Sequence, residues 1–222
     1  MKDFISVIIT TRNRKYKAER AVKSVINQSI SNYEIIVVDD CSKDQTSLYL
    51  KTKFPMIKII TNKVNLGGSA SRNIGVKYSK GNYLSFLDDD DSYYPKKLEI
   101  QYNLCSSNKN LSLVTSRYNI ISKDFERASN DYSKLVNKKL YFKNIYGGTS
   151  TYFTSKIYYD LVGGFDENLK SAQDWDFAYR MSKYGKIFQC KEVLVEFEDF
   201  KKNIRISNST LRTYLGHRDI YL

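Results

Sequence analysis

Short apolar runs alternate with segments of helical spacing through about the first 90 residues, and this alternation constrains the fold more than any other feature. The runs are apolar throughout, which is typical of strands covered on both faces by helices. The sequence therefore predicts an α/β fold, Rossmann-like and doubly wound, with a mostly parallel central sheet flanked by helices. The predicted strands are residues 4–10, 34–38, 57–61 and 83–87, and the predicted helices between them are residues 18–28, 46–54 and 69–79.

Polar side chains stand where three of these strands end. They are Thr10-Thr11, Asp39-Asp40 and the run Asp88-Asp89-Asp90-Asp91. The carboxyl ends of parallel strands share one edge of the sheet, where ligands bind in such folds. Four adjacent carboxylates repel one another unless a cation is near, and Mg²⁺ or Mn²⁺ prefers oxygen ligands and often shares its shell with phosphates. We expect a metal-dependent phosphate site here; the alternative is a solvated acidic turn.

Composition narrows the partners and the compartment. The 222 residues include 36 Lys plus Arg against 24 Asp plus Glu, a net charge of +12, which favours anionic partners. No arginine-rich arm or zinc-finger spacing is present, so no nucleic-acid partner is expected. Three separated cysteines indicate neither a disulfide framework nor a zinc site, so we expect a cytoplasmic protein. The basic segments 134–143 and 201–205 suggest that the protein makes a peripheral contact with anionic lipids at the inner face of the cell membrane.

The later chain is less regular. We expect a helix after Pro95, one or two strands in residues 111–121, and a variable loop over residues 122–143. A strand and a helix should lie between the glycine pairs at 147–148 and 163–164, followed by a helix over residues 172–184. The predicted domain organisation is a catalytic domain 1–195, with a nucleotide-binding half of about 1–95 and an acceptor-side half of about 96–195, and a C-terminal extension 196–222.

Five motifs in this order resemble the signatures of family-two inverting glycosyltransferases. The resemblance covers about residues 4–190 and implies a GT-A type fold, a nucleotide-sugar donor, in which uridine is the expected base, and Mn²⁺ or Mg²⁺ as cofactor. The motifs are Ser6–Asn13, Val37–Asp44, Asn65–Gly67 with Ser71–Asn73, Gly81–Tyr83 with Leu87–Asp91, and Gly163–Glu167 with Gln173–Asp176.

The resemblance implies a role for each polar group. Asp90 resembles the acid that holds the metal, and a cation there stabilises the leaving diphosphate. Asp174 resembles the base that takes the acceptor proton, although Gln173 stands where the family commonly has Glu. Asp39 can also be a structural residue, Arg12 a solvated cation, and Trp175 either a stacking or a core residue. The expected donor-binding residues are Thr10, Arg12, Asp39, Asp40, Arg72, Asp88 and Asp89.

These features predict a metal-dependent inverting glycosyltransferase that moves a sugar to a hydroxyl of a glycan or lipid-linked acceptor in bacterial surface polysaccharide synthesis. One alternative is a Mg²⁺-dependent phospho-acceptor signalling domain, which gives no role to Arg72. Another is a non-catalytic module that binds nucleotides or sugars. The sequence leaves the sugar, the linkage and the oligomeric state open.

Overall fold

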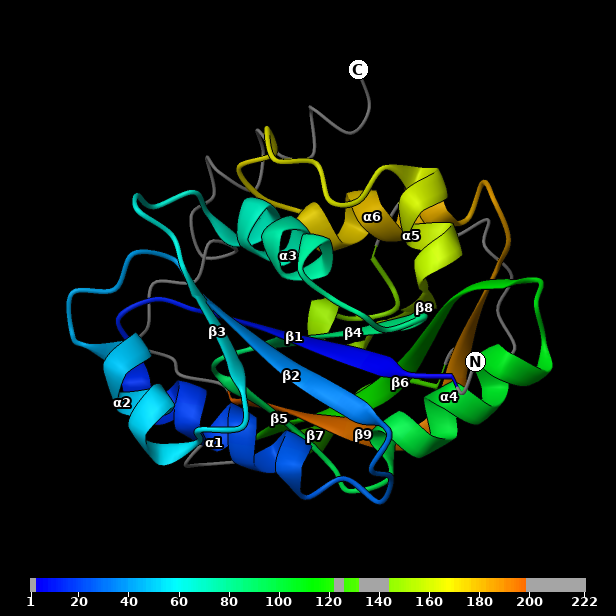
Figure 1. The fold of residues 1–222 in the computed structure, drawn as a ribbon. Helices are drawn as coiled ribbons and strands as arrows, with labels where there is room; N and C mark the ends of the chain where they lie inside the picture. Colours follow the sequence, from blue (N-terminus) through cyan, green and yellow to red (C-terminus); the bar gives the residue numbers. More distant parts are fainter. Residues whose placement is uncertain (1–2, 122–125, 132–143, 199–222) are drawn as a thin grey trace.

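The computed structural model describes residues 3–121, 126–131 and 144–198 and arranges them as one sheet between two layers of helices (Figure 1). The strands are β1 (Ile5–Thr11), β2 (Tyr33–Asp39), β3 (Lys58–Thr61), β4 (Tyr83–Asp88), β5 (Asp91–Tyr93), β6 (Leu111–Ile121), β7 (Glu126–Ala128), β8 (Phe153–Ser155) and β9 (Lys186–Glu198). The helices are α1 (Lys15–Ile26), α2 (Thr46–Lys53), α3 (Gly68–Lys77), α4 (Lys97–Ser107), α5 (Lys156–Val162) and α6 (Gln173–Met181), with a 3₁₀ turn, η2, at Thr149–Thr151.

The sheet is mixed, in the order β3-β2-β1-β4-β8-β6-β9-β5, with β7 paired to β6. Strands β3, β2, β1 and β4 run parallel, as the strand–helix alternation predicts. The later strands add antiparallel pairs of β8 with β4 and β6, although β6 and β9 are parallel. The predicted α/β fold with a central sheet flanked by helices is therefore confirmed.

Each face of the sheet has its own apolar core. Helices α1, α2 and α4 cover one face, and α3, α5 and α6 cover the other (Figure 1). Helix α1 buries Ala18, Ala21, Val22 and Val25 completely, at the spacing that places them on one side of a helix. Burying such a side chain contributes about 1.5–3 kcal/mol for the larger residues, so these faces hold the two layers to the sheet.

The strand register places the predicted polar groups at one level of the sheet. Thr10 lies opposite Val38 of β2 and opposite Asp88 of β4, and Thr11 lies opposite Asp39. Parallel pairing thus brings together side chains that are separated in sequence by helical crossovers. This edge is the candidate functional site.

Some boundaries differ from the sequence-based expectation. Helix α1 begins at Lys15 rather than at residue 18, and α6 ends at Met181 rather than at residue 184. Strand β9 was not predicted, and it continues to Glu198, so the structured chain passes the proposed boundary at residue 195. Within the predicted loop 122–143, residues 126–128 form the short strand β7.

No helix among the described residues is long and apolar enough to span a membrane. The basic segments 134–143 and 201–205 both lie outside the residues that the structure describes.

Candidate active site

Asp88, the last residue of β4, is the centre of the polar network. Its Oδ1 lies 2.5 Å from Nη2 of Arg72 and accepts from the Thr10 hydroxyl at 3.4 Å. Its Oδ2 accepts from the Thr149 hydroxyl at 3.1 Å, and its backbone N–H donates to the Ser150 hydroxyl at 3.0 Å. One carboxylate thereby links β1, α3 and η2.

Asp89 and Asp91 are buried and bound by protein groups. Asp89 is 4% exposed, accepts from the Thr11 hydroxyl at 2.7 Å and forms an ion pair with Arg14 at 3.0 Å. Burial raises the pKa of Asp89 to about 6, against the lowering effects of Arg14 and Thr11. Asp91 accepts from the Ser150 hydroxyl at 2.5 Å. Both residues therefore stabilise the end of β4 and the start of β5.

Asp90 differs from the buried Asp89 and Asp91 because its side chain is 26% exposed, while that of Asp88 is 33% exposed. One oxygen lies 3.1 Å from Nη1 of Arg14, and its backbone carbonyl accepts from Arg20 at 2.6 Å. Among the described residues, no group of three or more His, Cys, Asp or Glu is placed to hold a metal ion. The partly exposed carboxylates of Asp88 and Asp90 nevertheless fit Mg²⁺ or Mn²⁺, since such ions are commonly held by one or two carboxylates together with water and substrate phosphates.

Asp39 and Asp40 end β2 and are 2% and 6% exposed. Asp39 accepts from the Ser42 backbone N–H at 2.9 Å and from the Ser47 hydroxyl at 2.5 Å, so its visible role is to fix the following turn. Asp40 accepts from the backbone N–H groups of Leu66 and Gly67, each at 2.8 Å. These bonds hold the loop before α3 against the end of β2.

Arg12 reaches the same loop through Asn65. With the Asn65 amide oriented so that its nitrogen faces Asp40 at 2.6 Å, its oxygen accepts from Arg12 at 3.1 Å. Arg12 is exposed, and Arg14 is the arginine that pairs with the acidic run. Sequence analysis named Arg12 among the expected donor-binding residues, and the structure places Arg14 beside the carboxylates.

Arg72 lies in the second turn of α3 and is 7% exposed. Besides Asp88, its Nη1 contacts Oε1 of Gln173 at 3.4 Å, across the gap between α3 and α6. Its Nε and the hydroxyl of Ser69 are buried without a hydrogen-bond partner in the described part of the chain. Both atoms are covered by protein atoms, and leaving a buried donor without a partner is costly.

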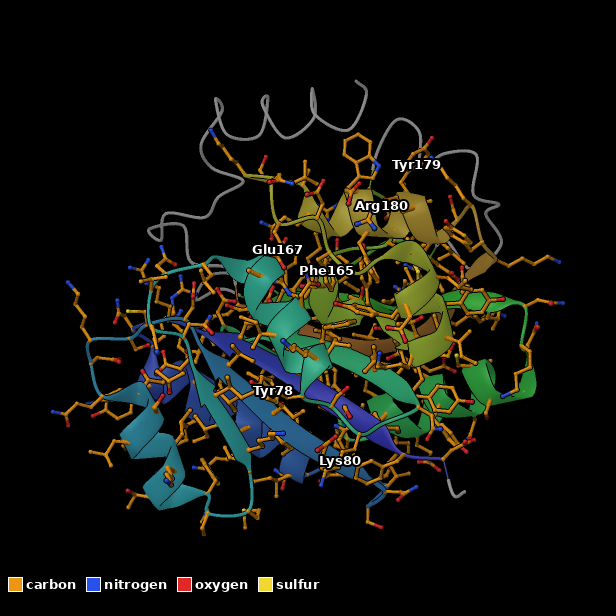
Figure 2. All side chains as sticks on the ribbon, turned by 45° about the horizontal axis from the view of Figure 1, so that its top comes forward. Tyr78, Lys80, Phe165, Glu167, Tyr179 and Arg180 are labelled. Carbon is orange, nitrogen blue, oxygen red and sulfur yellow. The ribbon has the colours of Figure 1, made fainter. Side chains whose placement is uncertain are left out.

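The chain between α5 and α6 packs directly against α3. Asn73 donates from its side-chain amide to the carbonyl of Phe165 and to Oε1 of Glu167, each at 2.8 Å. Figure 2 shows Phe165 and Glu167 beside α3, with Arg180 on α6. Arg180 donates to the carbonyls of Val162 and Gly164, each at 2.8 Å, which fixes the glycine turn relative to α6.

Asp174 lies in the first turn of α6 and is partly exposed. Its Oδ2 accepts from Nδ2 of Asn144 at 2.7 Å. Desolvation raises the pKa of Asp174, while the backbone N–H groups at the helix start, Arg72 and Asn144 lower it. A partly exposed carboxylate with this balance has the properties of a general base.

The neighbours of Asp174 have structural roles. Trp175 is 5% exposed and belongs to the core of the α3, α5 and α6 layer, and Asp176 forms an ion pair with Arg180 at 2.5 Å. The sequence alternatives of stacking and core packing for Trp175 are thus resolved in favour of the core.

The network joins three of the predicted site residues directly. Asp88 contacts Thr10 and Arg72, and Arg72 also contacts Gln173, the residue before Asp174. Asp39 and Asp40 instead bind the turn and loop beside them, and Asp89 and Asp90 pair with Arg14. Sequence reasoning missed three contributors that contact the aspartates. They are Asn144, Thr149 and Ser150, of which the last two follow the glycine pair 147–148, a loop signal beside hydroxyl groups that could have suggested them.

Comparison with known families gives one match that covers most of the chain. The family model described as Glycosyl transferase family 2 matches residues 6–160. An uncharacterized glycosyltransferase of Haemophilus influenzae is 30% identical over 215 residues, covering 94% of this chain and 73% of that protein. The putative colanic acid biosynthesis glycosyl transferase WcaA of Escherichia coli is 32% identical over 207 residues, covering 85% of this chain and 70% of that protein.

Two further relatives carry more specific names. The Escherichia coli protein named UDP-Glc:alpha-D-GlcNAc-diphosphoundecaprenol beta-1,3-glucosyltransferase WfgD is 34% identical over 124 residues, covering 55% of this chain and 49% of that protein. The crystal structure of S. aureus TarS 1-349 in complex with UDP matches with a TM-score of 0.74 and 22% identity, covering 88% of this chain and 60% of that chain. At that identity the match shows a shared fold.

Proposed function

Because the chain belongs to glycosyl transferase family 2, we propose that it moves a sugar from a nucleotide diphosphate sugar, with UDP as the expected nucleotide, to a hydroxyl group with inversion. One observation carries this proposal. The contacts Asp88–Arg72 at 2.5 Å and Arg72–Gln173 at 3.4 Å connect the ends of the parallel strands to the helix that carries Asp174. Groups suited to bind a diphosphate and a group suited to take a proton therefore share one site.

Donor binding is assigned to the strand ends and to the start of α3. Arg72, in the second turn of α3, is placed to neutralise phosphate charge, and the backbone N–H groups at the start of that helix would supply donors beside it. Thr10, Asp88 and Asp89 hold Arg72 and Arg14 on the donor side. We further propose that Arg12, Asp39 and Asp40 act through the turn and the loop that they fix around the nucleotide base.

The cation is assigned to Asp90. Asp88 and Asp90 are both partly exposed, but Asp88 is paired with the buried Arg72, so the carboxylate of Asp90 would hold Mn²⁺ or Mg²⁺ against the donor diphosphate. The bound cation would act as a Lewis acid that stabilises negative charge on the leaving nucleoside diphosphate. Arg14 is the protein cation that Asp90 contacts in this structure.

The transfer step is assigned to Asp174. The acceptor oxygen attacks the anomeric carbon from the face opposite the nucleotide, and the bond from that carbon to the phosphate oxygen breaks. The hydroxyl proton passes to the carboxylate of Asp174, and the electron pair of the broken bond leaves with the diphosphate. Inversion requires base and leaving group on opposite sides of the sugar, which agrees with Asp174 on α6 and the phosphate-binding groups on β4 and α3.

The acceptor is proposed to be a glycan or a lipid-linked saccharide in bacterial surface polysaccharide synthesis. The names of WcaA, with colanic acid, and of WfgD, with a diphosphoundecaprenol acceptor, support this class. A lipid-linked acceptor would place the protein at the cytoplasmic face of the membrane. We also propose that residues of about 1–95 form the donor side and residues of about 96–195 the acceptor side.

The assignment is tested by donor turnover with Asp174→Asn. The wild-type protein, given a panel of UDP-sugars, Mn²⁺ or Mg²⁺ and glycan or lipid-linked acceptors, should release UDP and form a product of inverted configuration. Asp174→Asn should bind UDP with unchanged affinity in calorimetry but transfer roughly 10²–10⁴ times more slowly, the range for losing a general base.

Asp160→Asn is the matched control, since Asp160 is an exposed acid that pairs only with Lys156 on α5 among the contacts seen. Equal transfer by Asp174→Asn and wild type would refute the base assignment. Absence of UDP release with every donor would refute transfer and favour the phospho-acceptor or binding-module alternatives.

A further inference from the structure

Asn144 joins the loop before η2 to the proposed base. Its Nδ2 donates to Oδ2 of Asp174 at 2.7 Å and to the carbonyl of Gly147 at 2.9 Å. Its Oδ1 accepts from the backbone N–H of Tyr146 at 3.1 Å. The two backbone partners, one donor and one acceptor, fix which way the amide faces, so the nitrogen must point to the carboxylate.

The loop that carries Asn144 is held in place by the conformation of Gly147 and by the buried Tyr152. Gly147 has φ +83°, a left-handed conformation that favours glycine, and a Cβ there would lie 2.7 Å from the Tyr118 ring. The fully buried Tyr152 has its hydroxyl 3.2 Å from the Gly147 carbonyl and 3.1 Å from the Asp174 carbonyl. The loop and the first turn of α6 thus share a buried anchor, and Asn144 is held at a constant position relative to Asp174.

The charged and titratable groups around Asp174 come from three elements. Arg72 of α3 lowers the pKa of Asp174, and Arg72 is itself paired with Asp88. Below it are the phenols of Tyr152 and Tyr146, which stay neutral because burial raises their pKa values. Asn144 is therefore the neutral side-chain donor that directly contacts the carboxylate.

We propose that Asn144 is a positioning residue of the transferase, which orients the carboxylate of Asp174 and stabilises its ionised form by donating to Oδ2. This role rests on the proposed function of Asp174 as the base. The bond restricts rotation of the carboxylate, so the acceptor hydroxyl meets an oxygen in a fixed direction. A hydrogen bond to the charged form also favours the ionised state that accepts a proton.

The role predicts a change in pH dependence that a merely structural residue would not cause. Without the amide donor, the carboxylate is desolvated with less compensation, so the acidic limb of the kcat–pH profile should move upward by about one unit in Asn144→Ala. In Asn144→Asp a second carboxylate would stand beside Asp174, so the limb should move further than in Asn144→Ala. At pH 7 we expect kcat to fall by roughly 10–100-fold, with the KM for the UDP-sugar unchanged.

Asn119→Ala is the matched control. Asn119 on β6 donates its side-chain amide to Oε1 of Glu126 at 2.6 Å, the same type of contact away from the cleft, so its variant should keep the wild-type profile. Far-UV circular dichroism and UDP calorimetry at each pH would confirm that the Asn144 variants are folded and bind donor product.

Three outcomes separate the inference from the function on which it rests. An upward shift ordered as Asn144→Asp above Asn144→Ala above wild type supports the positioning role. An unshifted limb in both variants, with active wild-type protein, overturns the role of Asn144 and leaves the transferase assignment standing. Wild-type protein without transfer overturns the assignment itself, and the role of Asn144 with it.

Discussion

At the scale of single residues, four adjacent aspartates have four different environments. Asp88 binds Arg72, Asp89 is buried with Thr11 and Arg14, Asp90 is partly exposed, and Asp91 accepts from Ser150. The sequence predicted their common edge, because strand ends are readable from apolar runs. It could not rank them, because the ranking depends on hydroxyl and guanidinium groups that come from distant segments.

We predict that Asp90→Asn removes most of the metal effect on donor binding. UDP affinity should rise with Mn²⁺ in the wild-type protein and change little in the variant, a loss of at least about tenfold, since the substitution takes away the charge of the carboxylate assigned to the cation. Calorimetry of UDP with Mn²⁺ and with EDTA measures this, and Asp160→Asn serves as the control. The same Mn²⁺ enhancement in Asp90→Asn would show that another group holds the cation.

At the scale of elements, a charged cluster around Glu19 joins α1 and α2, in the helix layer on the opposite face of the sheet from α6. Glu19 contacts Lys23 at 2.7 Å and Lys53 at 2.6 Å, and it accepts a bond from the hydroxyl of Tyr49. Hydrogen bonds from Lys23, Lys53 and Tyr49 lower the pKa of Glu19 to about 2. The cluster thus fixes the angle at which α2 leaves the end of β2.

We predict that Glu19→Gln destabilises the fold at neutral pH and much less in acid. A folded-state pKa of about 2, below the usual 4.5, means that ionised Glu19 stabilises the fold above pH 4.5 and that this contribution is lost as the pH falls towards 2. The free energy of unfolding should drop by about 1 kcal/mol at pH 7, because the lysine partners are exposed to water. Urea unfolding at pH 7 and pH 3 measures the difference; an equal loss at both values would contradict the ionic explanation.

Helices and strands that form through local interactions were predicted more accurately than those that form through contacts between distant segments. The helices of the first half were predicted because apolar spacing is local, and only their ends shifted. Strand β9 was missed because Glu192, Glu196 and Glu198 interrupt its apolar pattern. That strand forms through pairing with β6 and β5, with register shifts along β6, and such distant partners leave no local signal.

At the scale of the whole molecule, the candidate active site is assembled from two parts of the chain. The parallel strands β1, β2 and β4 supply one wall, and the segment from Asn144 through α6 supplies the other. For the first wall, sequence analysis predicted the order of strands and helices. For the second wall it predicted only the motifs, because β8 forms an antiparallel pair with β4, a strand far away in the sequence.

We predict that UDP and Mn²⁺ together raise the midpoint of thermal unfolding, and that two spectroscopic probes report the same increase. Trp175, the only tryptophan, lies in the second wall, whereas the proposed donor contacts are mainly in the first. At about 100 times the dissociation constant the ligand should add about 2.7 kcal/mol, or roughly 5–10 °C. Tryptophan fluorescence and circular dichroism at 222 nm should shift together; an unmoved fluorescence transition beside a shifted circular dichroism transition would show that the two walls unfold independently.

The missing side chain of Gly75 determines how near α3 lies to the sheet. A Cβ at this position would stand 2.4 Å from Cγ2 of Ile8, so any larger residue would push the helix outward. Arg72 lies about one turn earlier on the same helix, and a lifted helix would lengthen its 2.5 Å contact with Asp88. The distance of Arg72 from the strand ends is therefore set by a packing contact on the sheet side of the helix, and redesign of the proposed donor site must leave that contact intact.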